Sequence, residues 1–145
     1  GVDWSLSYSE PIIIDSYPGA IYQIMTNLLM NSMNHGFKGR DKGHVNITIS
    51  TEEESVMVYY HDDGNGIDVM NLESIFEPFF TTGKSGGNTG LGLYIVHSLV
   101  QSTLGGKISC ESVQGKGCAF TIVFPRTAPI QTEDKEQFTS LSNNY

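Results

Sequence analysis

The sequence has little positive charge and no long apolar run. Its 145 residues carry 8 Lys and Arg against 16 Asp and Glu, which gives a formal net charge of −8. A nucleic-acid-binding protein normally presents a basic face, so we expect no nucleic-acid partner. Because no run of about 18 apolar residues occurs, we expect no membrane span and no direct membrane contact from this domain. We also see no signal peptide.

Cysteine is scarce as well. The chain has two, Cys110 and Cys118, and they do not form a CxxC pair. Because a structural zinc site needs clustered ligands, we expect none here. Both cysteines lie in segments with strand patterns, so we expect small buried side chains rather than reactive ones.

The spacing of apolar residues predicts one α+β domain. Hydrophobic residues make up 39% of the chain, which is a globular composition. We expect a mixed sheet with helices packed on one face, over residues 1–125, followed by a polar, disordered tail over 126–145. The predicted helices cover 18–36, 91–102 and, more briefly, 70–76, and the predicted strands cover 11–15, 45–50, 56–61, 107–111 and 118–124.

The first predicted helix carries short polar side chains roughly opposite its apolar stripe. Asn27 and Asn31 are four residues apart, and Asn34 and His35 follow one turn later, so they share one face. An asparagine oxygen is a neutral ligand that suits Mg²⁺ and does not repel phosphate groups. The alternative is a polar helix face with no ligand, and this helix alone does not decide between them.

A carboxylate and two glycines follow the strand predicted over 56–61, in the segment Asp62-Asp63-Gly64-Asn65-Gly66. A carboxylate at a strand end can accept a hydrogen bond from an exocyclic amine such as that of adenine, and buried partners of this kind discriminate strongly against rings without the amine. The glycines allow a flat ring to approach the main chain closely. The alternative is a simple Asp-Gly hairpin turn.

Glycines also precede the second long helix, over residues 86–93. Free N–H groups at a helix N-terminus attract phosphate. No Gly-Lys-Ser/Thr follows, so this is not a Walker loop, and no strand directly precedes it as a dinucleotide fingerprint requires. The alternative is a flexible linker. Residues 77–90 form a long loop, and such loops are often functional lids.

Taken in order, these segments resemble the ATP-binding domain of histidine kinases in the GHKL superfamily. The resemblance covers roughly residues 10–125, and it includes the N box at 23–36, the G1 box at 62–67, the F box at 75–82, the G2 box at 90–96 and a final hairpin at 105–125. It implies a two-layer α/β sandwich that binds ATP between its helices and a lid.

The resemblance also implies a role for each matching residue. Asn31 would be the catalytic metal ligand for Mg²⁺, and Asp62 would hold adenine N6. Phe76, Phe79 and Phe80 would anchor the lid. Many relatives have Lys directly after the two threonines, where this chain has Gly83, so the contact of Lys84 with the γ-phosphate is the least matched role. The implied ATP-binding residues are Asn27, Asn31, Asn34, His35, Asp62, Gly64, Gly66, Ile67, Lys84, Gly90, Leu91, Gly92 and Leu93.

The resemblance implies a cytoplasmic kinase domain that uses ATP and Mg²⁺ and donates the γ-phosphoryl group to a histidine on a separate dimerisation domain. The expected partners are that domain and a downstream response regulator. Nothing in this chain resembles the phosphoacceptor segment. Two alternatives remain at this stage. One is another GHKL ATPase, against which the segment Phe76-Glu77-Pro78-Phe79-Phe80 argues, and the other is a degenerate domain that acts as a scaffold.

Overall fold

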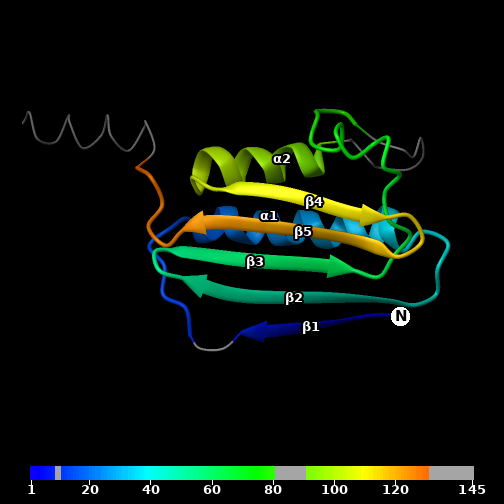
Figure 1. Cartoon of the computed structure of the whole chain (residues 1–145), viewed down its shortest axis with the longest axis horizontal. Coiled ribbons are helices and arrows are strands. Elements are labelled where there is room, and N and C mark those ends of the chain that lie inside the picture. Colours follow the sequence, from blue (N-terminus) through cyan, green and yellow to red (C-terminus); the bar gives the residue numbers. More distant parts are fainter. Residues whose placement is uncertain (9–10, 81–90, 131–145) are drawn as a thin grey trace, which may run out of the picture.

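A computed structural model describes residues 1–8, 11–80 and 91–130. Five strands form one sheet in the order β1-β2-β3-β5-β4, and the helices lie on one side of it (Figure 1). The strands are β1 (Val2–Tyr8), β2 (Gly43–Glu52), β3 (Ser55–Asp62), β4 (Lys107–Val113) and β5 (Gly117–Pro125), and the helical elements are α1 (Pro18–Asn31), η1 (Ser32–Gly36), α2 (Gly92–Ser98) and η2 (Leu99–Thr103).

The sheet is mixed, as the sequence predicts. β1 runs parallel to β2, whereas β2, β3, β5 and β4 pair antiparallel. Each long helix continues into a turn of π-helix, α1 into η1 and α2 into η2. The predicted α+β class, with a two-layer arrangement of sheet and helices, is confirmed.

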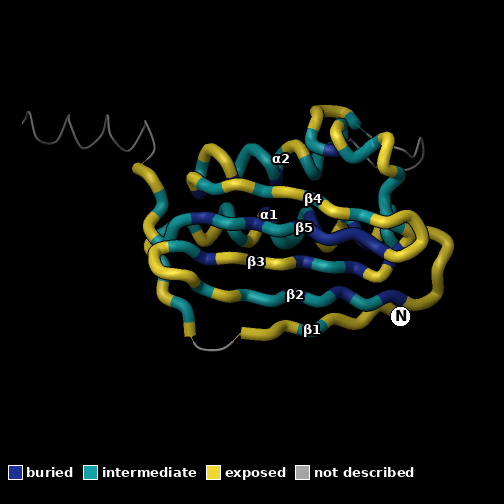
Figure 2. Tube along the Cα trace, viewed as in Figure 1, coloured by how far each residue is buried: buried dark blue, intermediate teal, exposed yellow. Residues whose placement is uncertain are grey.

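The core lies between the sheet and the two long helices. Ile24 and Leu28 of α1 are buried against the sheet, and so are Val96 of α2 and Val100 of η2. Pro18 occupies the first turn of α1, where its missing N–H costs nothing and its fixed φ favours the helix. Figure 2 shows that buried positions are concentrated in the central strands, whereas β1 is exposed along most of its length.

Two predicted elements are wrong. Residues 11–15 form no strand, because Pro11 has no N–H to donate and only Asp15 makes a bridge, to Thr127. Residues 70–76 form successive turns instead of a helix. Here Asp68 Oδ1 accepts a hydrogen bond from Met70 N at 2.9 Å, which favours a turn over helix propagation.

The edge strand β1 was missed by the prediction. Its alternation of Val2, Trp4, Leu6 and Tyr8 with polar residues is a period-two pattern typical of a strand, and this signal could have found it. Its apolar side chains lie in register with Gly43, Val45, Ile47 and Ile49 of β2, but Trp4 remains 66% exposed.

The packed domain extends beyond the predicted boundary at residue 125. Arg126 N donates to Glu54 O at 2.8 Å, and Asp15 exchanges backbone hydrogen bonds of 2.8 Å with Arg126 and Ala128. These contacts join the end of β5 to the segment before α1. The prediction of a disordered tail from residue 126 is therefore wrong for residues 126–128, and residues 131–145 lie outside the described part of the chain.

Candidate nucleotide-binding site

The carboxylate of Asp62 is held at the end of β3, in the middle of the sheet. It is only 1% exposed. Ser32 Oγ donates a hydrogen bond to its Oδ2 at 2.7 Å, and Gly64 N donates to its Oδ1 at 3.0 Å. Because an ionised carboxylate only accepts hydrogen bonds, both of its oxygens are oriented by donors and keep further acceptor capacity.

Glycines bring the loop after β3 against the end of the first helix. A Cβ on Gly36 would lie 3.0 Å from Asp62 Oδ2, and one on Gly64 would collide with the Gly36 carbonyl oxygen. Gly66 has a φ of +75°, in the left-handed region that favours glycine. The alternative of a simple Asp-Gly hairpin is wrong, because residues 63–80 form no strand, and the next strand among the described residues is β4, beginning at Lys107.

Hydrogen bonds from Asn65 hold this loop in place. The sequence analysis did not predict this structural role. Its N–H donates to Gly36 O at 2.7 Å. Its side-chain Nδ2 donates to the carbonyl oxygens of Lys38 at 3.0 Å and His35 at 3.3 Å. On the other side of the loop, Ile67 N donates to Ser112 Oγ at 2.6 Å. The loop therefore bridges the C-terminal end of η1 and the hairpin of β4 and β5.

The turn between β4 and β5 approaches the backbone of Asp62 closely at Gly117. Gly117 has a φ of +112°, and a Cβ there would collide with Asp62 O and lie 3.0 Å from the Cα of Asp63. We expect Gly117→Ala to lower the free energy of unfolding by roughly 2–3 kcal/mol, because it adds a backbone collision to left-handed strain. Denaturant unfolding measures this loss.

Gly115 provides a matched control in the same turn. Its φ is +85°, but a Cβ there meets nothing within 4 Å. Gly115→Ala should therefore cost only about 1 kcal/mol, from the left-handed conformation alone. Equal losses for the two variants would show that the contact with Asp62 O is unimportant.

The polar residues of the N box lie on the helical segment beside Asp62. Asn27 and Asn31 belong to α1 and are half-buried, whereas Asn34 and His35 belong to η1, where Asn34 is exposed and His35 half-buried. The Nδ2 atom of Asn27 is buried without a hydrogen-bond partner among the described residues. An orphaned buried donor is costly, and a bound ligand oxygen would satisfy it.

The imidazole of His35 is uncharged at neutral pH. Burial, and secondly the nearby Lys38 cation, lower the pKa of His35 from its ordinary value. A neutral imidazole offers one donor and one acceptor nitrogen.

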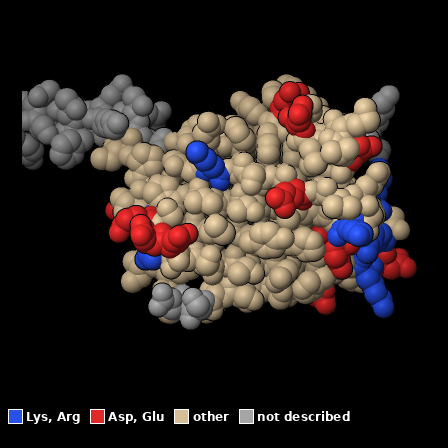
Figure 3. All heavy atoms as spheres, in the orientation of Figure 1, with Lys and Arg blue, Asp and Glu red and all other residues tan. Residues whose placement is uncertain are grey.

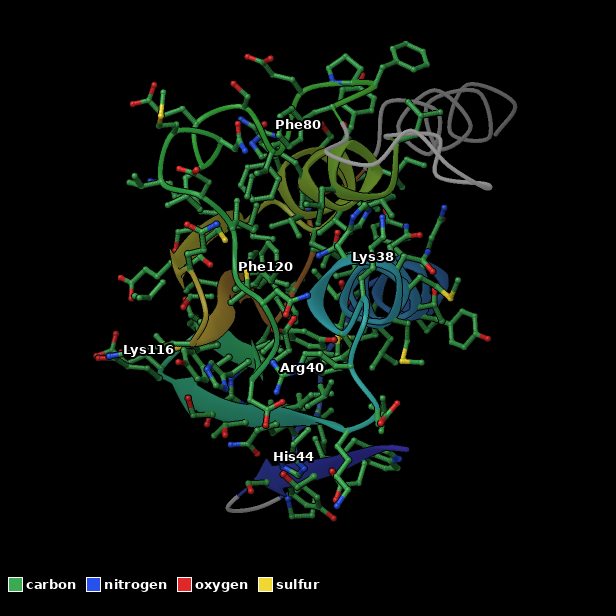
Figure 4. The ribbon with its side chains drawn as sticks, turned by 90° about the vertical axis from the view of Figure 1, so that its right-hand side faces the viewer. Lys38, Arg40, His44, Phe80, Lys116 and Phe120 are labelled. Carbon is green, nitrogen blue, oxygen red and sulfur yellow. The ribbon has the colours of Figure 1, made fainter. Side chains whose placement is uncertain are left out.

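Positive charge near this end of the domain comes from the loop between η1 and β2 and from the β4–β5 turn. Lys and Arg gather at the right-hand edge in Figure 3, and Figure 4, which looks onto that edge, labels Lys38, Arg40 and Lys116 there. Arg40 Nη1 donates to Asp63 O at 2.7 Å. Cations therefore lie near the loop after β3, although Figure 3 shows Asp and Glu side chains among them at the same edge.

Two of the three F-box phenylalanines pack against the core, and the third does not. Phe76 packs edge-on against Phe120, with ring centroids 6.3 Å apart, and lies 5.2 Å from the ring of His97. Phe80 is partly buried against the core. Phe79 instead is 72% exposed with a φ of 65°, so its predicted anchoring role is wrong.

The G2 box lies only partly within the described residues. Leu91 O accepts the first helical hydrogen bond of α2, from Ile95 N at 2.8 Å, and Gly92 is the first helical residue. Leu93 packs against the core. The candidate phosphate-binding residues Lys84 and Gly90 lie outside the described residues.

The two cysteines lie next to this site, Cys110 on β4 and Cys118 on β5. Cys118 is buried, Cys110 is half-buried, and both are free thiols with their Sγ atoms 3.4 Å apart. The hydrogen bond with Cys110, and secondly burial, raise the pKa of Cys118. Cys118 is therefore a protonated, packed side chain, as the sequence predicts.

The described residues contain no group of three or more His, Cys, Asp and Glu side chains able to hold a metal ion. A metal at this site would thus need amide oxygens and ligand oxygens. Across residues 1–8, 11–80 and 91–130, no helix has the length and apolar character needed to cross a membrane.

The fold and the site together define an ATPase domain of a known kind. The sequence model of one protein family, the histidine kinase-, DNA gyrase B- and HSP90-like ATPases, matches residues 17–128. The chain therefore belongs to this family.

Individual relatives narrow the comparison to sensor kinases. The chain is 34% identical over 128 residues to the two-component sensor PprA of Pseudomonas aeruginosa, covering 85% of this chain and 14% of PprA. It is 36% identical over 112 residues to the sensor histidine kinase ZraS of Escherichia coli, covering 77% of this chain and 23% of ZraS. The chain thus spans less than a quarter of either relative.

Solved structures agree with these relatives. The nucleotide-free catalytic domain of histidine kinase ThkA superposes with a TM-score of 0.74 at 29% identity, covering 87% of this chain and 80% of that domain. Full-length ShkA in complex with AMPPNP superposes with a TM-score of 0.73 at 27% identity, covering 89% of this chain and 27% of ShkA. The chain corresponds to a histidine kinase catalytic domain.

Proposed function

We propose that this domain binds ATP with Mg²⁺ and donates the γ-phosphoryl group to a histidine on a separate dimerisation domain. The observation that carries this proposal is the buried, doubly hydrogen-bonded carboxylate of Asp62, enclosed by Gly36 and Gly64. A carboxylate that can only accept hydrogen bonds fits the exocyclic amine of adenine. Gly64, Gly66 and Ile67 would line the purine ring.

The residues of the N box fit a magnesium-bound triphosphate. Mg²⁺ is coordinated by oxygen atoms of the protein, of substrate phosphates and of water, which suits a site whose described residues include no cluster of three or more carboxylate, His or Cys side chains. Asn31 would supply an amide oxygen to the ion, and Asn27, with its orphaned Nδ2, would support the same region. When bound, Mg²⁺ neutralises charge that develops on the phosphate oxygens.

The remaining candidate residues would position the phosphates. Asn34 and His35 would contact the phosphates or the ribose through hydrogen bonds. Leu91, Gly92 and Leu93 would border the triphosphate at the start of α2, together with Lys84 and Gly90. Phosphoryl transfer depends mainly on such positioning and charge neutralisation.

The acceptor histidine would lie outside this domain. His44 bonds Asp3 across β1 and β2, with Nδ1 and Oδ1 2.8 Å apart. His61 precedes Asp62 on β3, and its ring stacks on Tyr59 with centroids 6.3 Å apart. His97 lies on α2 against Phe76. A sensor histidine kinase also implies a response regulator as the downstream partner.

The domain alone should therefore bind ATP without phosphorylating itself. Incubation with γ-labelled ATP and Mg²⁺ should leave no acid-labile label on the chain, while calorimetry on the same sample shows nucleotide binding. Acid-labile label retained after gel filtration would contradict the absence of an acceptor. A failure to bind any adenine nucleotide would instead favour a degenerate scaffold.

A further inference from the structure

Two buried hydroxyl groups lie in line behind the carboxylate of Asp62. Ser32 Oγ lies 2.7 Å from Asp62 Oδ2 and 2.7 Å from the Tyr60 hydroxyl. Ser32 and Tyr60 are both 0% exposed. Burying two hydroxyl groups in a core is unfavourable unless they form hydrogen bonds, and here Ser32 bonds the carboxylate while Tyr60 bonds Ser32.

The charge of the carboxylate determines the direction of these hydrogen bonds. Ionised Asp62 can only accept, so the single hydroxyl proton of Ser32 is donated to Oδ2. Ser32 Oγ is then free to accept from Tyr60, whose other acceptor, Leu28 O, lies farther away at 3.1 Å. The favoured order of donation is Tyr60 to Ser32 to Asp62.

Packing holds this chain of hydroxyl groups in place. Ser32 is the first residue of η1, with its backbone N–H bonded to the carbonyl oxygens of Leu28 and Leu29. The ring of Tyr60 packs edge-on against Phe120, with centroids 6.3 Å apart. Burial raises the pKa of Tyr60, which keeps its hydroxyl protonated as a donor.

We propose that Ser32 and Tyr60 are positioning residues that set the purine selectivity of the site. Ser32 donates to Oδ2 and Tyr60 donates to Ser32, and together they hold the carboxylate of Asp62 in one orientation, so that it accepts from a 6-amino group and repels a 6-oxo group. This inference rests on the proposed function, because it assumes that Asp62 faces the purine. A carboxylate free to rotate would no longer be aimed at the 6-amino group, and the selectivity would fall.

The test compares ADP with IDP, which differ at the 6-position, by calorimetry with Mg²⁺. Ser32→Ala should weaken ADP binding roughly tenfold, since it removes a hydrogen bond to a charged group, and IDP binding should not weaken. Tyr60→Phe should weaken ADP binding by about threefold, a fraction of a direct bond. The double variant should match Ser32→Ala, because Tyr60 acts through Ser32.

Controls separate positioning from general stability. Tyr59→Phe removes a hydroxyl from the partly exposed neighbouring residue and should leave both affinities unchanged. Ser32→Cys keeps the volume but donates poorly, so it should reproduce the selectivity loss even if Ser32→Ala unfolds. Thermal unfolding checks that each variant is folded.

The outcomes are distinct. An equal loss of ADP and IDP affinity, or an unchanged ratio in Ser32→Cys, would overturn the positioning role. Additive losses of ADP affinity in the double variant would show that Tyr60 does not act through Ser32. Absence of ADP binding by the wild-type domain would overturn the proposed function itself, and this inference with it.

Discussion

Asp62→Asn should reduce the affinity for ADP by at least about 100-fold, because a buried site built around one acceptor loses both the bond to the purine amine and its charge. The amide also places an NH₂ group against donors, since Ser32 Oγ and Gly64 N both donate to the native carboxylate. Calorimetric titration with Mg²⁺ and ADP measures the loss.

The adjacent residue supplies the matched control. Asp63 is exposed, and its carboxylate accepts a hydrogen bond from His44 N at 2.8 Å. Asp63→Asn makes the same chemical change one residue away and should leave ADP affinity within about twofold, as expected for exposed substitutions. Similar losses in both variants would point to net charge rather than to a specific purine contact.

Asn31→Ala should remove most of the magnesium dependence of nucleotide binding. If its amide oxygen ligates the ion, the affinity for ATP measured with Mg²⁺ should fall on the order of 100-fold, which is the upper end of the losses seen when one supporting group of a metal site is removed. Binding measured in EDTA should be the same for the variant and the wild type, because no ion is present in either case.

This pair of titrations is its own control for folding. A loss of affinity that is equal with Mg²⁺ and with EDTA would place Asn31 in a structural role and remove it from the proposed metal site. Unfolding of the variant would be seen in both titrations and in its thermal transition.

Local sequence patterns predicted most of the elements near the site. The helical spacing of Ile24, Leu28 and Ser32 correctly predicted a buried stripe, because a helix buries one face at each turn. The alternation in β2 and β3 was equally informative. The short run at 11–15 was misleading, since apolar character alone does not provide a pairing partner.

The carboxylate and glycines of the candidate site have a local sequence pattern, but the residues that support them do not. Asp62 and the glycines that follow it carry a recognisable local pattern. Asn65 and Ser112 carry none, because their roles depend on carbonyl and amide groups from distant segments. Tyr60 looks like an ordinary apolar strand residue until its hydroxyl is seen beside Ser32.

By itself the sequence determined the order of the main helices and strands, and the placing of a carboxylate and glycines directly after a strand, because these are properties of neighbouring residues. Only the tertiary structure decided that Ser32 bonds both Asp62 and the Tyr60 hydroxyl, and that residues 126–128 close against Asp15. Those contacts join residues far apart in the chain, and their geometry depends on how the helix packs on the sheet.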